Sequence, residues 1–246
     1  MKALILAAGY ATRLYPLTLN QPKALLPINE KPIINYITEE IETIDSVDEI
    51  IVVSNEKFYP HFTQWKETYS GKLPVEIVND HTTDDSNKLG AVGDIQYVIE
   101  TLGIDDELLI IAGDNIFTFK LLDFYNEYKS KNCDMILTKE INDIEELKRM
   151  ANVTLDSDGK VILMEEKPQN PKSNIAAFAS YIYKKDTVKM IKQYLDEGNN
   201  PDAPGFFPSW LYKIKDVCAY TFTGECYDIG TPKAYKEVND IFAKNN

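Results

Sequence analysis

The chain has 246 residues, of which 44% are hydrophobic, and a formal net charge of −13 at pH 7. This length fits one large α/β domain with a sizeable core. The negative charge excludes proteins that grip the phosphate backbone of a nucleic acid. The longest apolar runs fall far short of the roughly 20 residues that span a bilayer, and the N-terminus lacks the pattern of a signal peptide. We therefore expect a cytoplasmic protein that binds neither nucleic acid polymers nor membranes.

The cysteine and histidine content narrows the chemistry further. Cys133, Cys218 and Cys226 are odd in number and widely spaced, which is typical of reduced thiols and gives no zinc spacing. The only histidines, His61 and His81, are twenty positions apart. Histidine-rich metal sites and histidine-based triads therefore have little material to work with.

Charge is distributed unevenly along the chain. Residues 1–38 hold four cations and one acid, a net charge of +3, so residues 39–246 carry −16. A basic segment in an acidic protein suits a small polyanion rather than a polymer. Arg13 lies in this segment and is one of only two arginines, the other being Arg149. Its planar, permanently charged fork suits phosphate oxygens.

The first half of the chain alternates between two kinds of segment. Apolar runs that predict strands cover residues 2–7, 49–54, 75–79, 107–112 and 134–138. Helical patterns lie between them, at 32–44, 59–69, 89–102 and 121–131. This alternation predicts a mostly parallel sheet covered by helices on both faces.

The second half has a different pattern. Strands are predicted at 153–155 and 161–166 around the hairpin-like turn 156–159, and then at 176–183 and 216–221. Helices are predicted near 187–195 and 208–212. A last helix is expected to open at Thr231-Pro232, with Thr as the cap and Pro at the first helical position. We find no repeat and no linker, so one domain over residues 1–246 is expected.

The most informative motif runs from Leu6 to Thr18 and continues into Pro22-Lys23. A buried strand ends where Gly9 lets the turn run close to a ligand, and backbone N–H groups in such a turn cradle phosphates. Thr12, Arg13 and Lys23 add side-chain donors. The spacing fits neither a dinucleotide fingerprint nor a Walker loop. For Gly9 alone, an ordinary strand–turn–helix is the better interpretation; for the joint pattern it is not.

This segment resembles the signature of the sugar-1-phosphate nucleotidyltransferases, or NDP-sugar pyrophosphorylases, roughly G-G-x-G-T-R-L-x-P-L-T followed by P-K. Ala8 and Ala11 stand where that pattern has glycine. The resemblance implies a single Rossmann-like domain of the GT-A type, with a mostly parallel mixed sheet. It also implies that Ala8, Gly9 and Thr12 bind the nucleotide.

Two aspartates extend the resemblance. Asp114 follows the apolar run 108–112, at the carboxyl end of a predicted strand where ligands bind in open α/β sheets. It could also cap the next helix. Asp228 lies in Tyr227-Asp-Ile-Gly-Thr-Pro232 and could be a turn residue. In the family, the aspartates of these two motifs hold Mg²⁺, which favours one or two carboxylates plus phosphate oxygens.

Two further motifs complete the set. Glu166-Lys167-Pro168 resembles the family's E-K-P, whose Glu meets sugar hydroxyls and whose Lys meets the sugar phosphate. A solvated strand edge is the alternative. Gly90 matches the glycine of the family's L-G-T-A-G stretch, which lies against the nucleobase; an ordinary helix start is the alternative there. The segment 198–211 is open between an acceptor pocket, a dimer contact and a packed loop.

The resemblance implies an enzyme that joins a nucleoside triphosphate to a sugar 1-phosphate with Mg²⁺ and releases pyrophosphate. Arg13 and Lys23 would neutralise the triphosphate. Glucose 1-phosphate with dTTP or UTP is the default pair, on family frequency alone. A cytidylyltransferase acting on phosphocholine, a glycosyltransferase and a non-catalytic nucleotide-sugar-binding module are the alternatives. The chain stops soon after its last helix, so no appended β-helix is expected, and homo-oligomerisation is left open.

Overall fold

The computed structural model describes residues 1–244 and has an α/β fold made of two compact units. The first unit comprises Met1–Lys88, Ile111–Leu122 and the segment from Gly224 onward. The second comprises Leu89–Ile110 and Asp123–Thr223. Strand β6 (Leu108–Ala112) contributes to both, because the division falls after Ile110.

The first unit is built on parallel strands. Strand β4 (Glu49–Ser54) pairs in parallel with β1 (Lys2–Leu6) on one side and with β5 (Val75–Asn79) on the other. The strands are almost continuously apolar because both faces of a parallel sheet are covered. Helix α1 (Ile33–Ile41) buries an isoleucine face, and helix α2 (Tyr59–Thr68) packs on β4 and β5.

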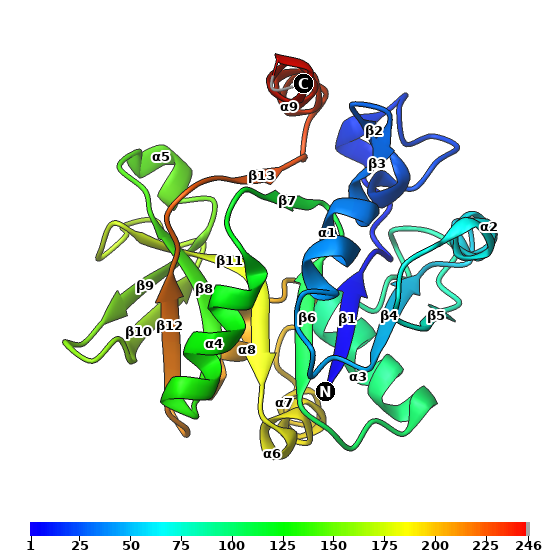
Figure 1. Ribbon diagram of the computed structural model, residues 1–246. Coiled ribbons are helices and arrows are strands. Elements are labelled where there is room, and N and C mark those ends of the chain that lie inside the picture. Colours follow the sequence, from blue (N-terminus) through cyan, green and yellow to red (C-terminus); the bar gives the residue numbers. More distant parts are fainter. Residues whose placement is uncertain (245–246) are drawn as a thin grey trace. The chain divides into compact units, whose positions relative to one another are not determined.

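Short elements complete the first unit. Two 3₁₀ turns, η1 (Thr12–Leu14) and η2 (Lys23–Leu25), follow β1. Two small antiparallel sheets join segments that are close or very distant in sequence: β2 (Pro27–Ile28) with β3 (Lys31–Pro32), and β7 (Asn115–Phe117) with β13 (Cys226–Asp228). Helix α9 (Pro232–Lys244) follows β13 and contacts β2 (Figure 1).

The second unit holds a mixed sheet. Strand β8 (Asp134–Glu140) pairs in parallel with β12 (Val217–Thr221) and antiparallel with the central strand β11 (Ile175–Tyr183). Strand β9 (Ala151–Leu155) then joins β11 to β10 (Val161–Glu166), both antiparallel. The antiparallel pair of β9 and β10 confirms the hairpin predicted around residues 156–159.

Helices cover the sheet of the second unit on both faces. In Figure 1, α4 (Leu121–Lys131) is drawn in front of these strands and α8 (Phe206–Leu211) behind them. Aromatic pairs make the contacts, because Phe124 of α4 packs on Tyr220 and Phe207 of α8 packs on Tyr183. The remaining helices are α3 (Ala91–Leu102), α5 (Ile144–Leu147), α6 (Lys185–Val188) and α7 (Met190–Asp196).

Most predicted elements are confirmed within two residues at each end. The helix expected near 187–195 is wrong in detail, because it is two helices, α6 and α7, separated at Lys189. The cap at Thr231 is confirmed, since its hydroxyl accepts a hydrogen bond from the Ala234 N–H at 3.1 Å. The sequence analysis did not predict β2, β3, β7, β13 or α5.

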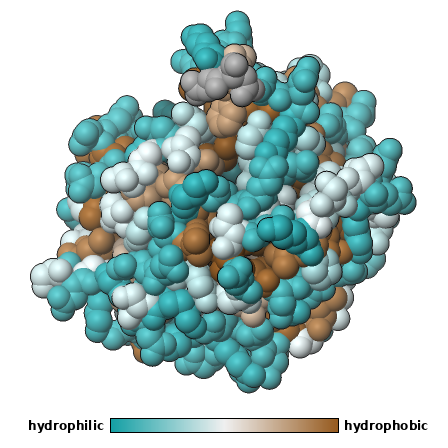
Figure 2. All heavy atoms as spheres, viewed as in Figure 1, coloured by the Kyte–Doolittle hydropathy of each residue, from teal (hydrophilic) through white to brown (hydrophobic). Residues whose placement is uncertain are grey.

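The visible surface is mostly polar. Figure 2 shows a face on which hydrophilic residues predominate, with hydrophobic atoms in smaller patches between them. Among residues 1–244, no helix combines the length and the apolar character that crossing a bilayer requires.

A buried carboxylate organises one end of the second unit. Asp134, at the start of β8, has no exposed side-chain surface. It accepts hydrogen bonds from the Lys184 N–H and the Thr187 hydroxyl, each at 2.7 Å, and pairs with the Lys215 ammonium at 3.1 Å. These three contacts tie the start of β8 to Lys184, Thr187 and Lys215.

Replacing this carboxylate tests its structural role. We expect Asp134→Asn to lower the free energy of unfolding by about 1–3 kcal/mol, because the buried amide has one acceptor oxygen where the carboxylate had two and places an N–H group among donors that it cannot pair with. The measurement is urea denaturation followed by circular dichroism. Asp186→Asn is the matched control, because Asp186 also pairs with Lys215, at 2.8 Å, but is 71% exposed; its effect should stay below about 1 kcal/mol. Equal effects would contradict the assignment.

Candidate functional site

The loop after β1 leaves its main chain uncovered at Gly9. A Cβ placed on Gly9 would meet no atom within 4 Å, so this stretch of main chain is accessible to a ligand. Ala11 adopts the left-handed conformation, with φ of 48° and ψ of 41°, and precedes the turn that carries Thr12 and Arg13. This conformation explains why the family pattern has glycine at the position of Ala11, since a Cβ disfavours it.

Buried side chains hold this loop from outside. The Asn55 amide donates to the Ala8 carbonyl at 2.8 Å, and the Thr18 hydroxyl donates to the Ala11 carbonyl at the same distance. Both Asn55 and Thr18 are fully buried. Neither supporting role was predicted from sequence: Asn55 lies outside the motif, and Thr18, its last residue, was assigned no contact.

Two carboxylates converge on one ammonium in the first unit. Lys23 Nζ lies 2.5 Å from Asp114 Oδ2 and 3.4 Å from Asp228 Oδ1, and its side chain is 13% exposed. The antiparallel pairing of β13 with β7 creates this arrangement, because it sets Asp228 opposite Asn115, the neighbour of Asp114. The Ile229 N–H also donates to the Asp114 carbonyl at 3.3 Å.

Glycine is required at the turn that presents Asp114. A Cβ on Gly113 would lie 2.9 Å from the Leu6 carbonyl oxygen, whereas the Gly113 N–H now donates to that same oxygen at 2.9 Å. The absence of a side chain therefore lets the end of β6 approach the end of β1. This contact brings Asp114 beside the loop that begins at Ala7.

These residues surround a cavity of about 220 Å³ in the first unit. Its polar lining is Arg13, Lys23 and Asp114, and small residues of the loop and of the turn after β6 form the rest. Crowding by surrounding protein atoms and the neighbouring Asp114 carboxylate raise the pKa of Asp228, although its side chain keeps 64% of its surface exposed; Lys23 and Arg13 oppose this shift. Two like charges and two cations therefore share one narrow space, an arrangement suited to a polyphosphate and a metal ion.

The second unit presents another charged pair. Glu166 ends β10 with its side chain only 9% exposed, and its carboxylate lies 3.6 Å from the ammonium of Lys167. Burial raises the pKa of Glu166, and Lys167 acts in the opposite direction. Lys167 itself has a positive φ of 50°, and its N–H donates to the Met150 carbonyl at 3.1 Å. The backbone is thus bent where the motif changes from Glu to Lys.

The segment 198–211 contacts two of the motif residues in the second unit. The carbonyls of Pro201 and Asp202 accept the N–H groups of Val92 and Ala91, each at 2.9 Å. A Cβ on Gly90, whose φ is 80°, would collide with the Pro201 carbonyl. At the other end of the segment, Gly205 lies so close to Glu166 that an added Cβ would displace its carboxylate.

The structure therefore assembles the predicted residues as two groups. Ala8, Gly9, Thr12, Arg13, Lys23, Asp114 and Asp228 belong to the first unit, and Gly90, Glu166 and Lys167 to the second. Within the described residues, no cluster of three or more His, Cys, Asp or Glu side chains offers a complete metal cage. A site with two protein carboxylates needs its remaining ligands from elsewhere.

Comparison with known proteins decides the family. The model of the nucleotidyl transferase family matches residues 2–245. The chain belongs to this family. A Sulfolobus acidocaldarius protein described as a candidate mannose-1-phosphate guanyltransferase is 30% identical over 97% of this chain and 62% of its own length. The bifunctional protein GlmU of Methanocaldococcus jannaschii is also 30% identical, over 97% of this chain and 53% of its own.

The nucleotidyl transferase fold is confirmed by solved structures. A UDP-glucose pyrophosphorylase complexed with UDP-glucose superposes with a TM-score of 0.85 at 23% identity, covering 100% of this chain and 99% of that one. The predicted mixed α/β sheet is thus shown. Because the chain spans only 53–62% of the two relatives above, their activities are not carried over from the match alone.

The burial of Glu166 predicts a pH-dependent stability. Because folding raises its pKa above the ordinary 4.5, the ionised side chain destabilises the fold; this cost is absent below pH 4.5 and grows as pH rises through the folded-state pKa. Glu166→Gln should therefore raise Tm at pH 7 by about 2–4 °C, the shift that about 1 kcal/mol gives in a chain of this size.

Thermal unfolding at pH 4.5 and pH 7 measures this effect. The gain from Glu166→Gln should shrink towards zero at the lower pH, where the wild-type side chain is protonated as well. Glu165→Gln is the control, because Glu165 is the exposed neighbour on the same strand. A gain that is the same at both pH values would contradict burial of charge as its cause.

Proposed function

We propose that this chain is a Mg²⁺-dependent enzyme that joins a nucleoside triphosphate to a sugar 1-phosphate, giving a nucleotide sugar and pyrophosphate. The observation that carries the proposal is the convergence of Asp114 and Asp228 on one cation beside the accessible loop at Gly9. Membership of the nucleotidyl transferase family supports it. The names of the relatives include guanylyl-, adenylyl- and uridylyltransferases acting on sugar 1-phosphates.

The two aspartates fit a magnesium ion. Their carboxylate oxygens already face a single positive charge, the Lys23 ammonium, so a cation is what this space stabilises. Mg²⁺ commonly takes one or two protein carboxylates and completes its shell with phosphate oxygens and water. When bound, it would neutralise charge on the reacting phosphates. Asp114 and Asp228 would hold it.

The chain's own residues supply positioning and charge. In the proposed reaction an oxygen of the sugar phosphate forms a bond to the α-phosphorus, and the bond to the bridging oxygen breaks, so that pyrophosphate leaves with the electron pair. Arg13 and Lys23 neutralise the triphosphate and the leaving group, and Thr12 and the loop N–H groups orient it. The attacking oxygen already carries negative charge, so no general base is needed.

The second unit is proposed to bind the acceptor. Lys167 offers an ammonium to the sugar phosphate, and the buried Glu166 carboxylate offers acceptors for sugar hydroxyls. Gly90, packed on the Pro201 carbonyl, presents main chain without a side chain and is proposed to lie against the nucleobase. Glucose 1-phosphate with dTTP or UTP is the default pair, and a hydroxyl-binding carboxylate favours a sugar over phosphocholine.

Pyrophosphate release is the decisive measurement. Purified protein with Mg²⁺ is assayed with each of five nucleoside triphosphates crossed with sugar 1-phosphates and phosphocholine. We expect release only when one triphosphate and one sugar phosphate are present together, and loss of release with EDTA. Release with phosphocholine as the only productive acceptor would show that the acceptor is an alcohol phosphate of that kind and not a sugar phosphate. A silent panel would contradict the proposed activity and favour a binding module.

The two arginines give a matched pair of variants. Arg13→Ala should lower kcat/KM by about 10²–10³-fold, because a preorganised charge on the leaving group is lost, while circular dichroism and Tm stay unchanged. Arg149→Ala, an exposed arginine in the second unit, should retain activity within about 2-fold. Near-normal turnover of a folded Arg13→Ala protein would overturn the role assigned to Arg13.

A further inference from the structure

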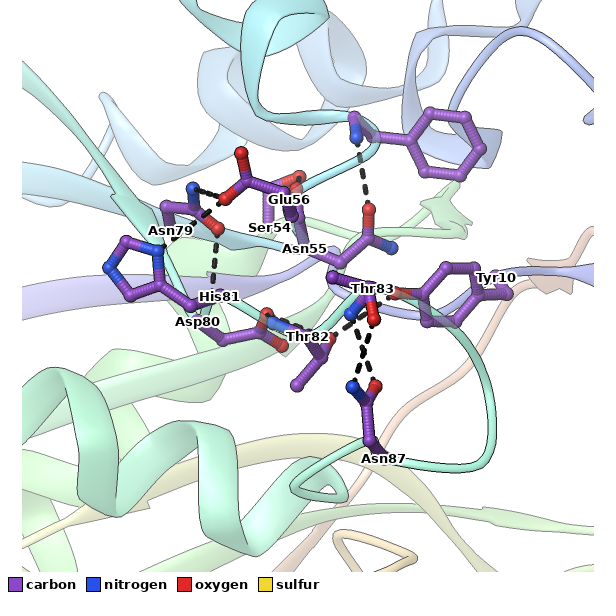
Figure 3. A network of polar contacts seen from close by, with 11 residues as sticks. Tyr10, Ser54, Asn55, Glu56, Asn79, Asp80, His81, Thr82, Thr83 and Asn87 are labelled. Atoms are coloured by element: carbon purple, nitrogen blue, oxygen red, sulfur yellow. Dashed lines mark hydrogen bonds and ion pairs between the residues drawn. The ribbon is translucent and has the colours of Figure 1, made fainter.

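The loop that begins at Ala7 after β1 and leads to the turn of Thr12 and Arg13 is called the phosphate loop below. The side chain of one residue in this loop points away from the accessible face. Tyr10 lies between Gly9 and Ala11, yet its side chain is only 6% exposed. Its ring packs on Phe58, with ring centroids 6.5 Å apart, and its hydroxyl lies 3.4 Å from Thr82 Oγ1. Figure 3 shows the Tyr10 hydroxyl directed at Thr82, which belongs to the segment after β5.

The direction of the Tyr10 hydrogen bond follows from its neighbours. Thr82 has one hydroxyl hydrogen, which it gives to Asp80 Oδ1 at 2.8 Å. The Tyr10 O–H therefore donates, and Thr82 Oγ1 accepts. Burial raises the pKa of Tyr10, which keeps this donor protonated.

The acceptor, Thr82, is itself held by several hydrogen bonds. Thr82 also donates its N–H to Asp80 Oδ1 at 2.7 Å, and its carbonyl accepts the Glu56 N–H at 3.0 Å. The Asp80 N–H in turn donates to the Ser54 carbonyl at 2.8 Å, at the end of β4. Asp80 and Thr82 are both buried. Tyr10 thus connects the loop after β1 to the end of the parallel sheet (Figure 3).

The loop has a strain that such an anchor offsets. Ala11, the next residue, is in the left-handed conformation, which costs an alanine free energy that a glycine does not lose. Such a backbone persists only where the surroundings hold it. The Thr18 hydroxyl and the Leu14 N–H donate to the Ala11 carbonyl. On the other side of Ala11, the side chain of Tyr10 anchors the main chain.

From this arrangement we infer that Tyr10 is a positioning residue for the triphosphate, which keeps the loop in the binding conformation although Ala11 stands where glycine would be relaxed. The inference rests on the proposed function of the loop. Tyr10 needs no contact with the substrate. The Tyr10 hydroxyl raises the fraction of molecules whose loop has the conformation that binds the triphosphate. Without the hydroxyl, this fraction falls and the apparent affinity for the triphosphate falls in proportion.

Removing only the hydroxyl tests this inference. We expect Tyr10→Phe to raise KM for the triphosphate about 3- to 10-fold, with kcat and KM for the sugar phosphate within 2-fold of wild type. Saturating triphosphate restores the competent loop, which is why kcat is spared. A variant that merely unfolded in part would lower kcat and leave KM unchanged, so the two cases are distinguished.

A double-mutant cycle with Ala11→Gly tests the link to backbone strain. The Ala11→Gly change removes the penalty that Tyr10 offsets, so Tyr10→Phe in that background should change the triphosphate KM by less than 2-fold. An undiminished effect of Tyr10→Phe in the Ala11→Gly protein would overturn the coupling. Thr82→Val should reproduce Tyr10→Phe, and Thr82→Ser, which keeps the acceptor, should not.

A control and a binding probe separate this inference from the proposed activity. Tyr69→Phe removes another hydroxyl bond of the first unit, from Tyr69 to Glu42 at 2.5 Å, and should leave every constant unchanged. Calorimetric titration with tripolyphosphate measures the affinity of the loop for phosphates without turnover and without a nucleobase. Tyr10→Phe should weaken the binding of tripolyphosphate 3- to 10-fold. Wild-type binding with no turnover would refute the activity alone, whereas equal binding by Tyr10→Phe would refute the inference.

Discussion

The site in the first unit depends on placing two carboxylates close enough to share one cation. Asp114 and Asp228 repel each other, and the Lys23 ammonium between them offsets that repulsion. The arrangement is possible because a three-residue strand from the last part of the chain pairs with β7 directly after Asp114. Gly113 completes it by letting the end of β6 contact the end of β1. The phosphate loop, the cavity and the proposed metal site all follow from this packing.

The phosphate loop itself is defined as much by its supports as by its sequence. Asn55, Thr18 and Tyr10 each hold it through buried polar groups that lie outside or turn away from the accessible face. A loop that leaves main-chain groups free, as proposed for ligand binding, has fewer internal hydrogen bonds to hold its conformation. Fixing it from behind compensates for this and reduces the conformational entropy lost on binding.

The sequence allowed prediction of the helices and strands that show a regular hydrophobic pattern, and of the site residues that belong to a recognisable motif. Buried strands such as β4 and capped helices such as α9 have local patterns, so their existence and approximate ends were predictable. The pairing of β7 with β13 was not, because each strand has three residues and their contact spans the chain. Asn55 and Gly205 were missed for the same reason. Neither carries a motif, and each matters only through a distant partner, Ala8 or Glu166.

The close approach of Gly205 to Glu166 has a consequence for selectivity. A carboxylate confined in this way has little room to move and few water molecules to solvate it. An acceptor that supplies hydroxyl donors would relieve that condition, whereas a deoxy analogue of nearly the same shape would leave the carboxylate with Lys167 but without the missing donor. Sites built in this manner reject the analogue that lacks a group far more strongly than hydrophobic pockets reject one that lacks a methylene. Under the proposed function, the second unit would therefore select acceptors by their hydroxyl groups more than by their size.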